Sequence, residues 1–384
     1  MNAPSDKFPK GFFWGSSTAA YQVEGGIENT DWAKAGREGK VPPAGKACDH
    51  YNRFEEDFAI AQSLGHNAHR FSIEWARIEP EEGRFDEREI EHYRMVLSAL
   101  KSRGLEPFVN LWHFTLPTWF AEKGGFGQKD APRLFARYCA YVTQQLGNRS
   151  HFWLTINEPL IWASGGYLKG KWPPFRKNPL AFIAVQSALI AAHKEAYRAM
   201  KNINPTIAIG VAKNNIYFSA DRLPWNILAK EFMNWFWNRR FLDAIAGYQD
   251  FIGLNHYFYK HFGRKKELPR SDMGWDIYPE AIYHCLVDLK KYKKPVYVSE
   301  NGIADEADTQ RGDFIKNYLF YVKKAIDEGA DIRGYFYWSL LDNFEWSFGF
   351  QKKFGLVAFD PVTFARTIRS SAFVYQKIIE NQSV

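Results

Sequence analysis

Eight short apolar runs recur along the chain, and each is followed by sequence typical of a helix or a loop. We expect these runs to be β-strands at residues 12–15, 69–73, 107–113, 152–156, 207–212, 251–255, 296–298 and 332–338. The intervals between them are long enough for a crossover helix and a loop, which parallel strands require. Most runs are continuously apolar, as expected for strands buried on both faces. Eight such units predict a single (β/α)8 barrel domain over residues 1–384.

A doubly wound open sheet is the alternative way to combine alternating strands and helices. It does not explain why polar or hydrogen-bonding residues follow nearly every apolar run. These residues are Gln22, Glu24, Arg70, His113, Asn157, Glu158, Asn214, Asn255, Tyr257, Glu300, Trp338 and Glu345. In a barrel the carboxyl ends of all eight strands meet at one mouth, where the active sites of this architecture lie. The pattern therefore favours the barrel.

Two of the apolar runs end in a glutamate. Glu300 follows the run at 296–298 and precedes Asn301-Gly302, a dipeptide that favours a turn. Glu158 follows the run at 152–156, and Pro159 prevents that strand from continuing. Two carboxyl groups that face one site are what hydrolysis of a glycosidic bond requires. Either motif alone occurs in ordinary surface turns, so the prediction depends on their combination with the eightfold pattern.

Composition narrows the class of protein. Hydrophobic residues make up 46% of the 384 residues, which is ample for a core and excludes a disordered chain. Aromatic residues reach 17%, and we expect Trp and Tyr near the strand ends to form a pocket for sugar rings. The net charge is +7, but the basic runs are short, so we expect a solvated surface and no nucleic-acid partner; an acidic partner is the alternative. No zinc-ligand spacing, P-loop or dinucleotide fingerprint occurs, so neither a metal nor a cofactor is expected.

The cellular setting is inferred from three features. Cys48, Cys139 and Cys285 are far apart and odd in number, which is typical of a reducing compartment. The first residues lack the basic and apolar regions of a signal peptide. The longest apolar segment, residues 181–192, is too short to span a bilayer. We therefore expect a cytoplasmic protein with no membrane partner, and the sequence leaves the oligomeric state open.

Seven motifs, in this order, resemble glycoside hydrolase family 1, the β-glucosidase and β-galactosidase family. They are FPKGFFWG (8–15), YQVEG (21–25), HRFSI (69–73), TINEP (155–159), GLNHY (253–257), VSENG (298–302) and WSLLDNFEW (338–346). The chain is shorter than most members, chiefly between Asn214 and Phe251. That segment is rich in aromatic residues. We interpret it either as a helix packed outside the barrel or as a shortened wall of the aglycone side.

The resemblance implies a retaining double displacement and assigns roles to individual residues. Glu300 matches the nucleophile and Glu158 the acid/base, with Arg70 as the cation that keeps Glu300 ionised. Tyr257 would align Glu300, and Asn157 would hold the sugar 2-hydroxyl. The residues implied to bind the sugar are Gln22, His113, Asn255, Trp338, Glu345 and Trp346.

The expected substrates are terminal β-linked glucosides, galactosides or related small β-glycosides. A 6-phospho-β-glycosidase is one alternative, which we disfavour because a carboxylate at Glu345 would repel phosphate. The phosphate-accepting branch of the family has small polar residues where this chain has Phe344, Glu345 and Trp346. A non-catalytic sugar-binding barrel is the other alternative. It predicts the loss of Glu158, Glu300 or Arg70, and all three are present.

Overall fold

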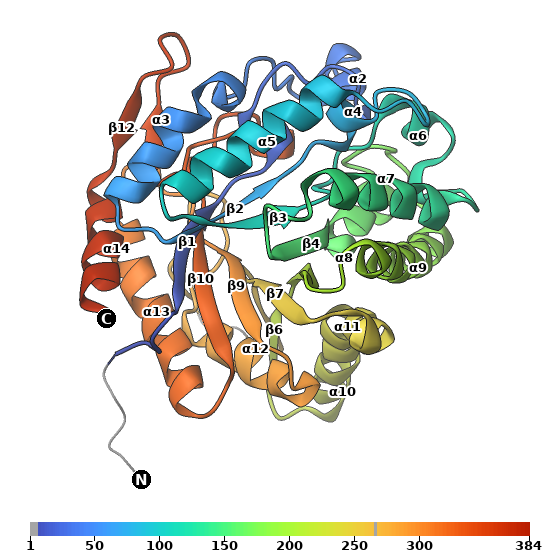
Figure 1. The fold of residues 1–384 in the computed structure, drawn as a ribbon. Coiled ribbons are helices and arrows are strands. Elements are labelled where there is room, and N and C mark those ends of the chain that lie inside the picture. Colours follow the sequence, from blue (N-terminus) through green and yellow to red (C-terminus); the bar gives the residue numbers. More distant parts are fainter. Residues whose placement is uncertain (1–6, 265–266) are drawn as a thin grey trace.

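Eight parallel strands close into a barrel in the computed structural model, which describes residues 7–264 and 267–384. The order around the barrel is β1-β10-β9-β7-β5-β4-β3-β2, so strands that follow one another along the barrel sequence are also neighbours in space. Helices surround this sheet (Figure 1). The predicted (β/α)8 barrel is confirmed, and the open doubly wound sheet is wrong because β1 pairs with both β2 and β10.

The barrel strands correspond one to one to the eight predicted runs. They are β1 (Phe13–Ser17), β2 (Ala68–Ser72), β3 (Glu106–Asn110), β4 (Phe152–Asn157), β5 (Ala208–Asn214), β7 (Phe251–Asn255), β9 (Val296–Asn301) and β10 (Ile332–Trp338). The seventh run was expected to end at residue 298, but β9 continues through Glu300. The third was expected to reach residue 113, but β3 ends at Asn110, so His113 lies on the loop beyond it.

Helices and short turns connect the strands. The α-helices are α1 (Ala20–Val23), α2 (Asp31–Arg37), α3 (His50–Ser63), α4 (Trp75–Ile78), α5 (Glu87–Ser102), α6 (Thr118–Glu122), α7 (Ala131–Leu146), α8 (Pro159–Ala163), α9 (Pro179–Ile203), α10 (Pro224–Met233), α11 (Arg240–Ile245), α12 (Glu280–Leu289), α13 (Arg311–Asp327) and α14 (Ser370–Asn381). The long helices are amphipathic, with their buried side against the strands. Within the described residues, no helix is both apolar and long enough to cross a membrane.

The interior of the barrel is apolar at one end and polar at the other. Phe108, Phe152 and Phe251 fill the amino-terminal half, and the rings of Phe108 and Phe152 stack with centroids 4.2 Å apart. Since alternate residues of a strand share a face, the next inward positions of the same strands reach the mouth. On β7, for example, Phe251 lies in the apolar half, and Asn255, four residues later on the same face, lies at the mouth. The polar layer thus lies at the carboxyl ends of the strands, at the mouth of the barrel.

Irregular strand pairing changes which residues point inward at two positions. On β9, Val298 pairs with Leu254 but Glu300 pairs with Asn255, so one residue is passed over. On β4, the register also shifts between Leu154 and Asn157. A bulge of this kind adds a residue to one strand and turns the side chains after it to the other face. Glu300 and Asn157 therefore face the interior, which strict alternation from Tyr297 and Leu154 would not give.

The aromatic segment between β5 and β7 lies outside the barrel. It forms β6 (Tyr217–Ala220), α10, the π-helical turn η3 (Asn234–Arg239) and α11. β6 pairs with β8 (Tyr259–Phe262) in a small parallel sheet that begins beyond the carboxyl ends of β5 and β7. α10 packs on this small sheet and on η3, and none of its own residues is buried. Of the two interpretations of this segment, the helix outside the barrel is correct.

Candidate active site

Glu300 lies at the end of β9 and is 4% exposed. Its Oε1 accepts a hydrogen bond from Nη1 of Arg70 on β2, and its Oε2 accepts one from the Tyr257 hydroxyl at 2.8 Å. The turn after it requires a glycine, because a Cβ at Gly302 would lie 1.8 Å from the carbonyl oxygen of Trp338. The contact between Arg70 and Glu300 is thus an ion pair between two buried side chains.

Glu158 follows β4 and stands at the N-cap of α8, with the left-handed backbone angles φ 42° and ψ 60°. Pro159 begins the helix directly after it. Glu158 Oε1 accepts hydrogen bonds from Asn255 Nδ2 at 3.0 Å and from Asn214 Nδ2 at 3.2 Å. Burial, and next the charge of Glu300, raise the pKa of Glu158 to about 8, although both amides oppose that rise. Glu158 therefore retains its proton at neutral pH.

A chain of hydrogen bonds connects the two glutamates behind the pocket. Arg70 donates to Glu300 through Nη1 and to Asn157 Oδ1 through Nη2, the latter at 2.6 Å. Asn255 Nδ2 donates to both Asn157 Oδ1, at 3.1 Å, and Glu158 Oε1. The Asn255 carbonyl oxygen accepts from Ser299 Oγ at 2.7 Å. All six side chains are nearly fully buried, so their relative positions are closely constrained.

A pocket of about 520 Å³ opens above these groups. Nine of the eleven predicted site residues line it: Gln22, His113, Asn157, Glu158, Tyr257, Glu300, Trp338, Glu345 and Trp346. Arg70 and Asn255 lie behind them, in contact with Glu300 and Glu158 respectively. The volume and the mixture of aromatic and polar walls suit a small sugar.

The pocket presents hydrogen-bonding groups next to flat rings. The His113 ring lies nearly parallel to the rings of Trp338 and Trp346, with centroids 5.9 and 6.0 Å away. Asn157 Nδ2 contacts His113 Nε2 at 3.2 Å, and burial followed by the nearby Arg70 charge lowers the His113 pKa. His113 is therefore neutral. Burial, and then the charges of the two catalytic candidates, raise the Glu345 pKa to about 8.

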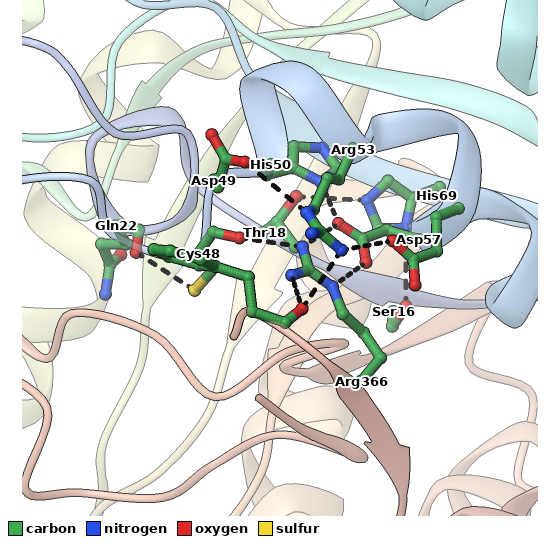
Figure 2. Close-up of polar contacts among 12 residues, drawn as sticks. Ser16, Thr18, Gln22, Cys48, Asp49, His50, Arg53, Asp57, His69 and Arg366 are labelled. Carbon is green, nitrogen blue, oxygen red and sulfur yellow. Dashed lines mark hydrogen bonds and ion pairs between the residues drawn. The ribbon is translucent and has the colours of Figure 1, made fainter. Parts of the chain in front are cut away.

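Gln22 is held by the loop that follows β10. Its Nε2 donates to Asn343 Oδ1 at 3.0 Å and to the Phe344 carbonyl at 2.9 Å. Its Oε1 has no hydrogen-bond partner among the described residues. Cys48, whose Sγ donates to the Asp342 carbonyl at 2.9 Å, connects this region to the polar cluster shown in Figure 2. The Gln22 amide is thus oriented with one acceptor left for a ligand.

The polar cluster of Figure 2 lies between β1, α3 and the strand β12 (Arg366–Ile368). At its centre is Asp57, which is fully buried and accepts two hydrogen bonds from Arg366 and one from His50. Arg366 also donates to the Cys48 carbonyl at 2.9 Å. These contacts attach the carboxyl-terminal hairpin (β11, Val357–Phe359, with β12) to the first barrel unit. Their role is structural.

Sequence reasoning did not identify several residues of the site. Asn214 was noted only as a polar strand end, yet it donates directly to Glu158. Trp172 and Trp275 also line the pocket, but they lie on long loops with no strand or motif beside them. In contrast, Glu24 forms an ion pair with Arg77 at 2.8 Å and accepts from Tyr93, so it serves packing. Trp172 and Trp275 were missed because loop residues have no periodic pattern in the sequence.

Lys213 is a further buried group next to the site. It precedes Asn214 on β5, points away from the barrel axis, and is 1% exposed. Its Nζ donates to the Asn214 carbonyl and lies 6.0 Å from the centre of the Trp237 ring. Burial lowers the Lys213 pKa to about 7, against the attraction of Glu158. Over residues 7–264 and 267–384, no three His, Cys, Asp or Glu side chains are grouped so that they could hold a metal ion.

The geometry defines a class of protein: a barrel enzyme with one protonated and one ion-paired glutamate at a sugar-sized pocket. The family model for glycosyl hydrolase family 1 matches residues 4–252 and 242–384. Beta-glucosidase A of Thermotoga maritima is 35% identical over 447 residues, covering 98% of this chain and 99% of the relative. A beta-galactosidase of Pyrococcus woesei is 30% identical and covers 98% of both chains. Because 447 exceeds the 384 residues of this chain, the first relative contains segments that this chain lacks.

Solved structures agree with these relatives. The beta-glycosidase from Pyrococcus horikoshii superposes with a TM-score of 0.92 at 37% identity, covering 98% of this chain and 96% of that one. The family 1 β-glucosidase from Thermotoga maritima superposes with a TM-score of 0.94 at 32% identity, covering 99% and 100%. This chain belongs to glycosyl hydrolase family 1. It is a shortened member and a retaining β-glycosidase.

Proposed function

We propose that this enzyme hydrolyses terminal β-linked glucosides and galactosides, with Glu300 as nucleophile and Glu158 as acid/base. The observation that carries the proposal is the difference between the two carboxyl groups. Glu300 forms an ion pair with Arg70, whereas burial raises the pKa of Glu158 to about 8. At neutral pH one group can attack the anomeric carbon while the other protonates the leaving oxygen, as a retaining mechanism requires.

The charge of Glu300 links the two steps of the reaction. When Glu300 forms the glycosyl ester it loses its negative charge, which is the second largest cause of the raised Glu158 pKa. The Glu158 pKa therefore falls in the intermediate, and the ionised carboxylate can deprotonate the attacking water. The same residue thus acts first as an acid and then as a base.

Other residues hold the reacting groups and the sugar. We assign Tyr257 and Arg70 to the alignment of Glu300, and Asn157 to the sugar 2-hydroxyl. Asn255, predicted as a sugar contact, has its polar atoms engaged by Asn157, Glu158 and Ser299, so we assign it a positioning role. Gln22, His113 and Glu345 supply contacts to the hydroxyls, and the sugar face packs on Trp338 and Trp346.

The substrate range and the setting of the enzyme complete the proposal. The relatives named beta-glucosidase and beta-galactosidase support both sugars as substrates. Glu345 is half-buried and lies close to both catalytic carboxyl groups, and a 6-phosphorylated sugar is disfavoured because its dianion would add to the negative charge of Glu300 there. We further propose one catalytic domain and a cytoplasmic setting, which the three unpaired, buried cysteines support.

Replacing the nucleophile tests the assignment of Glu300. Glu300→Gly should abolish hydrolysis of a chromogenic β-glucoside, because no carboxylate remains to form the glycosyl ester. Added azide should occupy the vacated space, attack from the same face and give the α-glycosyl azide. A variant that keeps full activity would refute the role of Glu300. Proton NMR of the wild-type reaction gives a second check, since retention requires the β-anomer to form first.

A further inference from the structure

The outward face of α10 and η3 is apolar. Trp225, Leu228, Phe232 and Trp235 are 64%, 70%, 58% and 48% exposed. Their spacing of three, four and three residues places them on one stripe of the helix. A surface helix ordinarily turns such a stripe toward the core, whereas here it faces solvent.

The exposed stripe continues onto the first turns of α9. The ring of Phe236 lies 5.9 Å from that of Phe232 and 6.1 Å from that of Phe182 on α9. Next to Phe182, Leu180 is 81% and Ile183 is 39% exposed. Figure 1 shows α9, α11 and α10 one after another along one side of the barrel. We call the six side chains Leu180, Ile183, Trp225, Leu228, Phe232 and Trp235 the α10 patch.

Basic residues flank the α10 patch along the chain. Residues 176–187 and 221–240 contain six Lys or Arg but only two Asp or Glu. One of these acids, Glu231, pairs with Lys230 at 2.7 Å. Arg176, Lys177 and Arg222 are exposed and form no ion pair with any residue that the structure describes. The whole chain also carries a net charge of +7. The patch therefore combines apolar and tryptophan side chains with unpaired positive charge.

We propose that the α10 patch binds this enzyme peripherally to an anionic lipid surface. Trp, Phe and Leu side chains would enter the interface between headgroups and acyl chains while the basic side chains face the anionic headgroups. A second copy of this chain is a poorer partner, since a twofold contact through this patch would bring two basic rims together. The sequence predicted no membrane partner because no segment could span a bilayer, but a peripheral contact requires only an exposed face.

The patch is separate from the chemistry of the enzyme. None of its six side chains is among the described residues that line the pocket. Substitutions in the patch should therefore leave hydrolysis of a soluble chromogenic β-glucoside unchanged. Membrane binding and the proposed catalytic roles can thus fail independently of each other.

Flotation of the full chain with lipid vesicles tests the proposal. The enzyme should float with vesicles of equal phosphatidylcholine and phosphatidylglycerol, and remain unbound with phosphatidylcholine alone. Replacing Trp225 and Phe232 together with Ser should lower the bound fraction at least about tenfold. Phe320→Ser is the matched control, because Phe320 is 56% exposed on α13, outside the patch. Raised salt should also weaken binding.

Three results would overturn the proposal. The first is equal binding by the wild type and the double variant, and the second is no binding of the wild type to anionic vesicles. The third is a concentration-dependent dimer in sedimentation velocity that only the double variant loses, since that would assign the patch to a second copy. Unchanged hydrolysis by the double variant shows in each case that it is folded.

Discussion

Glu158→Gln tests whether catalysis depends on the proton that Glu158 carries, because it removes that proton and keeps the shape of the side chain. The amide keeps the size of the carboxyl group but cannot donate the proton that the leaving oxygen takes. General acid catalysis contributes about 10²- to 10⁴-fold to such a step, so kcat/KM for an alkyl glucoside should fall by that factor. A dinitrophenyl glucoside, whose leaving group needs no proton, should lose far less in kcat/KM.

The pKa of Glu158 sets the alkaline limb of the activity. Because this pKa is about 8, the rate of the wild type should be at its maximum at lower pH and should decline as the pH rises through about 8. One pH unit higher, at about pH 9, only about a tenth of the enzyme retains the proton, so the rate should be about tenfold lower. In Glu158→Gln this limb should be absent when the dinitrophenyl glucoside is the substrate.

Stability gives an independent measure of the same proton. The folded state keeps the Glu158 proton from about pH 4.3, where an unfolded glutamate loses it, up to about pH 8. Across this interval Glu158 lowers the free energy of unfolding by at most about 1.4 kcal/mol per pH unit. Glu158→Gln should therefore be more stable than the wild type at neutral pH and equal to it near pH 4. An alkaline limb that Glu158→Gln leaves in place, with no gain in stability, would refute the reasoning.

Two other substitutions test neighbouring contacts. Tyr257→Phe removes the 2.8 Å hydrogen bond to Glu300, so kcat should fall by about tenfold or more. The far-ultraviolet circular dichroism spectrum should stay the same. An unchanged kcat would contradict the alignment role. Asp57→Asn disrupts the buried pair with Arg366 and should cost about 3–5 kcal/mol of unfolding free energy near neutral pH. Although burial acts to raise it, Arg366 and His50 lower the Asp57 pKa, so this stability is present above about pH 4 and is lost as the pH falls through the folded-state pKa. Urea unfolding at neutral and acidic pH measures the difference, and a cost that does not shrink in acid would contradict the ion-pair explanation.

The sequence alone determined the architecture and most of the site. Eight apolar runs with intervals long enough for crossover connections leave few alternatives to a closed parallel barrel, since the handedness and length of such connections are tightly constrained. Glu158 and Glu300 were recognisable because each follows an apolar run and is itself followed by residues that favour a turn or end a strand. Each motif alone also fits a surface turn, so the prediction of both positions depended on their combination with the eightfold pattern of apolar runs.

Tertiary structure decided where those side chains point. Bulges on β4 and β9 turn Asn157 and Glu300 into the barrel, and a bulge depends on the pairing of two strands distant in sequence. The raised pKa of Glu158 results from burial and from Glu300, neither of which a linear sequence encodes locally. Likewise, the spacing of Trp225, Leu228 and Phe232 predicts a helix with an apolar face. Only the packing of α10 against β6 and β8 determines that this face meets solvent.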